Sequence, residues 1–106
     1  MKAQLTLTDR FAALEILPTT GNFATWKIVR KLQEQLSLTE EEIKEYRVVE
    51  QGDMITWENN TKTAEIEFGE FAEAMIRERL ISMDKDQKLE SRHYRLYELF
   101  VEDNYD

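Results

Sequence analysis

The segment LTEEEIKEY runs from Leu38 to Tyr46 and contains four glutamates in a stretch of six residues. Side chains three or four residues apart share a helix face, so two of these carboxylates could hold a calcium or magnesium ion. Thr39 and Glu42, however, have the spacing of a capping box, and acidic side chains in a first turn complement the helix dipole. We therefore interpret the cluster as a solvated helix start, with an acidic docking surface or a metal or catalytic site as the alternatives.

More carboxylates follow this cluster, and they could extend it into one surface. The alternation of residues 64–68 places Glu65 and Glu67 on the same side of a strand, about 6.6 Å apart. Such a surface could occupy the basic groove of a nucleic-acid-binding protein, although glutamate on a half-exposed strand also keeps the strand soluble. The residues of this candidate partner-binding face are Glu41, Glu45, Glu58, Glu65 and Glu67.

The remaining residues offer no catalytic or metal-binding set. The chain has no cysteine and one histidine, His93, which we interpret as a half-buried packing residue. A calcium loop starting at Asp84 would place Leu89 where glycine is required and Arg95 where glutamate is required. No phosphate-binding glycine pattern is present. The sequence thus predicts a protein that is not an enzyme and that uses no cofactor and no metal.

The net charge of −8 is concentrated in the middle of the chain. Residues 1–33 carry +3, residues 34–78 carry −9 and residues 79–106 carry −2. A phosphate backbone or an anionic membrane repels such a chain, so we expect a protein partner rather than direct nucleic-acid or membrane binding. Without an apolar run long enough for a membrane span or a signal peptide, a cytoplasmic location is expected.

The periodicity of the apolar residues, together with the capping, proline and turn residues between them, predicts the order of the elements. Helices are expected from about Thr6 to Leu17 before Pro18, from Asn22 to about Leu36, and from Thr39 as a short third helix. Alternating residues around Gly52 and over 64–68 predict strands, with a turn-rich segment at 58–62 between them. Two further helices are expected over 70–83 and 90–101. The prediction is a single α+β domain over residues 1–106, frayed from about 102. It is mainly helical, with a two- to three-stranded antiparallel hairpin or meander inserted around 47–68.

Aromatic residues within the expected helices were assigned to the core or to an interface. Phe23 and Trp26 fall on the apolar side of the second helix, and Phe71 falls on that of the fourth. The last helix has an apolar stripe wider than a single contact needs, and tyrosine is favoured at interfaces. We interpret this stripe as core packing, with an interface for a partner or a second copy, formed by Tyr94, Tyr97 and Phe100, as the alternative.

The chain contains TDRFAALEILPTTGNFATWKIVRKLQEQLSLTEEEIKEY, followed by GDMITW and EIEFGEFAEAMI. With these segments, its overall pattern resembles small uncharacterised proteins encoded by phages and prophages of Gram-positive bacteria. It implies a phage setting, in the host cytoplasm or the virion. We expect an acidic inhibitor of a host nucleic-acid-binding defence protein, or alternatively a virion assembly adaptor that self-associates through its C-terminal aromatic helix.

Overall fold

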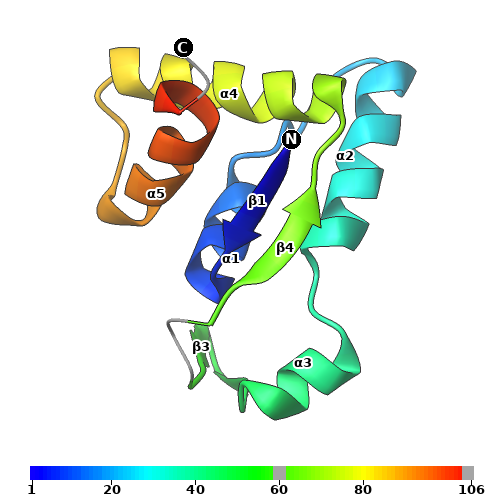
Figure 1. Cartoon of the computed structure of the whole chain (residues 1–106), viewed down its shortest axis with the longest axis vertical. Helices are drawn as coiled ribbons and strands as arrows, with labels where there is room; N and C mark the ends of the chain where they lie inside the picture. The colour runs from blue at the N-terminus through cyan, green and yellow to red at the C-terminus, as the bar shows by residue number, and fades with distance from the viewer. Residues whose placement is uncertain (59–61, 104–106) are drawn as a thin grey trace.

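A computed structural model describes residues 1–58 and 62–103 of the chain. It confirms the predicted α+β class and mainly helical content (Figure 1). In chain order the elements are β1 Lys2–Leu5, α1 Leu7–Glu15, α2 Phe23–Leu36, α3 Glu40–Glu45, β2 Val49–Gln51, β3 Met54–Thr56, β4 Ala64–Glu67, α4 Glu70–Lys85, a 3-10 turn Ser91–His93, α5 Tyr94–Tyr97 and a π-helical turn Glu98–Glu102. The predicted turn at Asn59–Thr61 and the last three residues of the predicted frayed tail lie outside the described residues.

The strands form two separate antiparallel pairs. The hairpin β2–β3 turns at Gly52, whose positive φ of 61° suits a two-residue turn. Strand β4 does not extend this hairpin into a meander. It pairs with β1, so that Lys2 lies opposite Glu67 and Leu5 lies opposite Ala64. Strand β1 was not predicted, because a four-residue strand whose partner lies some sixty residues away has no local signal in the sequence.

The β1–β4 sheet has one dry face and one wet face, as the alternation in β4 predicts. Ala3, Leu5 and Ile66 are buried, whereas the side chains between them point outward and are exposed. The buried face joins a core built with α1, α2, α4 and α5. In Figure 1 the sheet lies in front of α1, with α4 across the top and α2 along one side.

The predicted helix starts are confirmed by their caps. Thr6 caps α1 in a capping box with Asp9, and Asn22 caps α2 by accepting from the Thr25 N–H at 2.9 Å. Thr39 and Glu42 form the predicted capping box of α3, with both hydrogen bonds at 3.1 Å. The capping side chains thus fix where the helices begin, as their sequence spacing indicated.

Three aromatic residues predicted to be buried are exposed instead. Phe23 and Phe71 are each 76% exposed, and Trp26 is 37% exposed. The buried face of α2 is narrower than predicted and consists of Val29, Leu32 and Leu36. Helical periodicity gives the direction of a side chain, but whether another element covers that direction depends on the tertiary arrangement.

Candidate protein-docking surfaces

The most acidic part of the molecule is a small lobe at one end, formed by α3 and the β2–β3 hairpin (Figure 1). We call residues 39–58 the acidic lobe; they carry seven acidic and two basic side chains, a net charge of −5. Every residue of β2 and β3 is exposed, and α3 has no buried residue. The lobe therefore offers most of its side chains to solvent or to a partner.

Backbone hydrogen bonds fix how the chain leaves α3 and enters the hairpin. Arg47 has a positive φ of 52°; its N–H donates to the Lys44 carbonyl, and the Val48 N–H donates to the Ile43 carbonyl. This is a Schellman motif with arginine at the position usually taken by glycine. The Glu58 N–H then donates to the Tyr46 carbonyl at 2.7 Å, which closes the hairpin back onto the end of α3.

A buried arginine joins the acidic lobe to the body of the protein. Arg10 of α1 is only 3% exposed; its Nε donates to the Leu36 carbonyl at 3.1 Å and its Nη2 to the Ser37 carbonyl at 2.6 Å. The same guanidinium donates to both carboxylate oxygens of Glu42, at 2.6 and 3.3 Å. Arg10 thus binds the end of α2 and the first turn of α3 at once, in the forked geometry that guanidinium groups favour.

Two aromatic side chains complete the attachment of the lobe. Trp57 packs on Phe11 of α1 with a ring-centroid distance of 5.3 Å, and Tyr46 is 3% exposed. Lys62 lies over the Tyr46 ring and also pairs with Glu45. The lobe is therefore held by one charged clamp and two rings rather than by a core of its own.

The clamp lowers the pKa of Glu42 below its ordinary value of 4.5, mainly because the carboxylate accepts hydrogen bonds from Arg10. A carboxyl group with a lowered pKa stabilises the fold at pH values above its ordinary pKa. This stabilisation is lost as the pH falls through the folded-state pKa. We therefore expect Glu42→Gln, which keeps the capping geometry, to unfold at lower urea than the wild type near neutrality. The gap between the two midpoints should narrow as the pH falls below the ordinary pKa of 4.5. A gap that stayed constant would contradict the assigned pKa.

The residues of the predicted acidic face fall into two groups. Glu41, Glu45 and Glu58 belong to the acidic lobe, whereas Glu65 and Glu67 lie on the wet face of the β1–β4 sheet, and all five are exposed. Cations accompany three of the five: Lys62 pairs with Glu45, Arg47 with Glu58 at 3.5 Å, and Lys2 stands opposite Glu67. The strand glutamates thus share their face with a lysine, and the net negative charge is greatest in the lobe.

Four exposed apolar side chains add to the acidic lobe. Met54 is 67% exposed, and Ile43, Val49 and Ile55 are each more than 40% exposed. Met54 stands opposite Gln51 in the register, and register partners share a face of the sheet. Val49 lies two residues from Gln51 on the same strand, so Val49 and Met54 are on the same face of the hairpin. Every residue of both strands is exposed, so the described part of the chain buries neither face of the hairpin.

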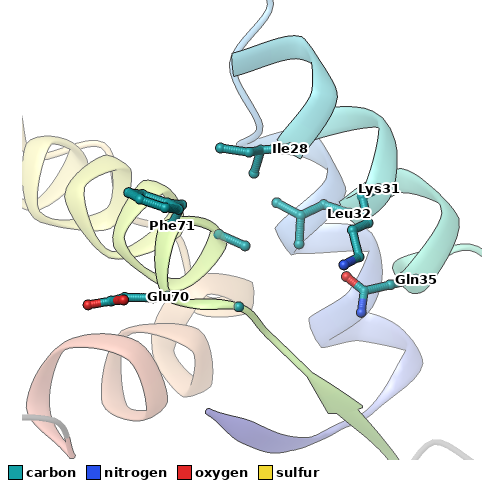
Figure 2. A pocket seen from close by; sticks show the side chains of 8 residues that line it. Ile28, Lys31, Leu32, Gln35, Glu70 and Phe71 are labelled. Atoms are coloured by element: carbon teal, nitrogen blue, oxygen red, sulfur yellow. The ribbon is translucent and has the colours of Figure 1, made fainter. Parts of the chain in front are cut away.

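A second surface is the groove between α2 and α4. Two adjoining cavities of about 180 and 550 Å³ share Ile28 and Phe71 as lining residues. Figure 2 shows Ile28 and Leu32 of α2 pointing toward the first turn of α4, with Glu70 pointing away from α2. The lining includes Lys31 and Arg79 as well as Glu70 and Glu78, so charge does not indicate the class of a partner.

The three residues of the candidate interface in the C-terminal segment differ in their exposure. Phe100 is completely buried, with its ring edge-on to Phe68 at 5.1 Å, which agrees with the core-packing interpretation of this residue rather than with the interface alternative. Tyr94 is 69% exposed, and Tyr97 is half-buried with its hydroxyl donating to Asp84 at 3.3 Å. The predicted single helix is instead a 3-10 turn, one α-helical turn and a π-helical turn, which changes the direction of Phe100 relative to the tyrosines.

His93 is a packing residue, as predicted, although it is fully rather than half buried. Its Nδ1 accepts a hydrogen bond from the Glu90 N–H at 2.9 Å, which caps the 3-10 turn. Burial, followed by the nearby Arg92 charge, lowers its pKa from 6.5. The neutral ring therefore serves the packing of the C-terminal segment.

Residues 1–58 and 62–103 contain no group of three or more histidine or acidic side chains placed to hold a metal ion. Within the same ranges, no helix has the length and apolar character needed to cross a membrane. Compared with family models, curated proteins and solved structures, the chain gives no match. Its function is therefore inferred from its own geometry and charge.

Proposed function

We propose that the protein is a non-enzymatic binding module that docks on a basic protein surface through its acidic lobe. One observation carries the proposal: residues 39–58 combine a net charge of −5 with four exposed apolar side chains. Charge complementarity would steer encounter with a basic partner, while the apolar side chains would supply the contact area that charges alone do not. The Arg10 clamp would hold this surface in one orientation before it binds.

The resemblance to phage proteins gives the setting in which we place this activity. A host protein that binds nucleic acid presents a basic surface to phosphate groups, and a rigid acidic protein can occupy the same surface. We propose that the chain acts as such an inhibitor, in the cytoplasm of the host. Occupation of a basic groove would block access of nucleic acid without any chemical step.

Charge reversal in two places tests the proposal. Glu41→Lys combined with Glu50→Lys changes exposed carboxylates of the acidic lobe, and neither carboxylate belongs to an ion pair between described residues. Glu65→Lys combined with Glu67→Lys makes the same charge change on the β1–β4 sheet. With each protein as bait in host lysate at two salt concentrations, we expect the lobe variant to lose the salt-sensitive partner captured by the wild type. The sheet variant should retain it.

The opposite pattern would place the docking surface on the sheet, and equal capture by both variants would remove the acidic mechanism altogether. A third variant, Val49→Ser with Met54→Ser, leaves the charge unchanged and tests the apolar contribution. We expect this variant to bind more weakly with an unchanged salt dependence, because salt screens charges but not apolar burial.

Self-association in a virion assembly adaptor remains the second candidate. The exposure of Tyr94 favours it, whereas the burial of Phe100 removes one of its three residues. Light scattering over a range of protein concentrations distinguishes the two functions. A strict monomer at high concentration would leave the acidic-lobe proposal as the one supported.

A further inference from the structure

A cavity of about 360 Å³ lies between the end of α4 and the C-terminal turns, at the other end of the molecule from the acidic lobe (Figure 1). We call it the Tyr94–Tyr97 cavity. Its lining includes two tyrosine rings and four carboxylates, contributed by Asp84, Glu90, Tyr94, Tyr97, Glu98 and Glu102. The apolar side chain of Leu89 adds to its wall, and no lysine or arginine lines it. The cavity therefore combines aromatic surface with an excess of carboxylates.

The nearby arginines are engaged in ion pairs, and one of these pairs involves a carboxylate of the cavity, that of Glu90. Arg92 pairs with Glu15 at 3.0 Å and with Glu90, and Arg95 donates to Asp9 at 3.0 Å and to the Gln4 carbonyl at 3.0 Å. They tie the C-terminal turns to β1 and α1 instead of filling the cavity.

The carboxylates of the cavity differ in how far they are already engaged. Asp84 accepts the Tyr97 hydroxyl, and Glu90 is paired with Arg92. Glu98 and Glu102 make no ion pair with the described part of the chain. Both follow Tyr94 and Tyr97 in the same helical segment, so two unpaired anionic groups border two aromatic rings.

We propose that the Tyr94–Tyr97 cavity binds an arginine side chain of a partner protein. A guanidinium stacks on aromatic rings and can donate to two carboxylates at once, whereas an ammonium is compact and more strongly hydrated. Arginine fits the combination of rings and separated carboxylates better than lysine does. The site lies outside the acidic lobe and goes beyond the proposed function, so either can fail without the other.

The test uses the acetylated, amidated tripeptide Gly-Arg-Gly and its citrulline counterpart, which has nearly the same shape but no charge. In an amide chemical-shift titration of the full chain, we expect the arginine peptide to saturate in the millimolar range and to shift signals of residues 84–102. The citrulline peptide should bind at least about tenfold more weakly, because it lacks the charge that the carboxylates and rings attract. The lysine peptide should fall between the two.

Variants separate this site from the acidic lobe. Glu98→Gln with Glu102→Gln, or Tyr94→Leu alone, should weaken binding of the arginine peptide, and Tyr94 is exposed enough for its replacement to leave the fold intact. Glu41→Gln with Glu50→Gln removes the same charge from the acidic lobe and should leave peptide binding unchanged. Equal binding of the citrulline peptide, shifts confined to residues 39–58, or unchanged binding by the cavity variants would each overturn the proposal.

Discussion

Replacement of Arg10 by methionine is expected to destabilise the protein by about 3 to 5 kcal/mol, because removal of one partner leaves a carboxylate and two carbonyl groups without their donor. The guanidinium makes four hydrogen bonds, to Leu36, Ser37 and both oxygens of Glu42, and its side chain is almost completely buried. Methionine retains most of the apolar volume of the arginine side chain, so the loss of stability reports the polar contacts. Urea unfolding of the wild type and the variant measures the difference in their free energies of unfolding.

Arg30→Met provides the matched control, since Arg30 is exposed on α2 and its replacement should change stability by less than about 0.5 kcal/mol. Combining Arg10→Met with Glu42→Gln completes a double-mutant cycle. We expect the second substitution to cost much less in the Arg10→Met background than alone, because the charge pair is already broken. If the two effects simply added, the clamp would not act as a unit. Arg10→Met should also weaken capture of the partner, since it releases the acidic lobe.

The second large effect is expected at Phe100. Phe100→Ala should cost about 3 to 5 kcal/mol, because it leaves a cavity where a completely buried ring meets Phe68 edge-on. Tyr94→Ala, six residues earlier in the same segment, should change stability by less than about 0.5 kcal/mol because Tyr94 is largely exposed. Thermal and urea unfolding of the two variants compare them directly.

This pair of substitutions also tests how the C-terminal segment is divided. If Phe100→Ala left stability unchanged and instead altered the oligomeric state, Phe100 would be an interface residue and the π-helical turn would be wrongly placed. If Tyr94→Ala unfolded the protein, the exposed wall of the Tyr94–Tyr97 cavity would be part of the core. The expected result is a large loss of stability for the first substitution and none for the second.

Local chemistry accounts for the parts of the fold that the sequence predicted. The pair Thr39 and Glu42 marks the start of one helix, and Asn22 by itself marks the start of another. Such marks can be recognised in a sequence because a capping side chain binds a backbone N–H only two or three residues away. Helix ends were less predictable. Arg47 and Gln87 both adopt a positive φ, of 52° and 58°, after α3 and α4, where the usual signal would be glycine.

Long-range pairing accounts for most of what the sequence did not reveal. The alternation of residues 64–67 predicts β4 correctly, but nothing in it indicates that the partner is β1 instead of β3. The same limit applies to the candidate sites. The exposure of Glu41, Glu45 and Glu58 followed from composition, whereas the clamp on Glu42 requires Arg10, thirty-two residues away along the chain. The exposure of Met54 and Phe71 likewise depends on which elements do not cover them.

The sparse attachment of the acidic lobe has a consequence for the motions of the protein. Of residues 39–58, only Tyr46 is buried, so the β2–β3 amides can exchange their hydrogens by a local opening that leaves the rest of the fold intact. The amides that join β1 to β4 flank Leu5 and Ile66 in the common core and can exchange only when that core opens. A partner seated on the lobe would therefore slow exchange in the hairpin far more than in the sheet.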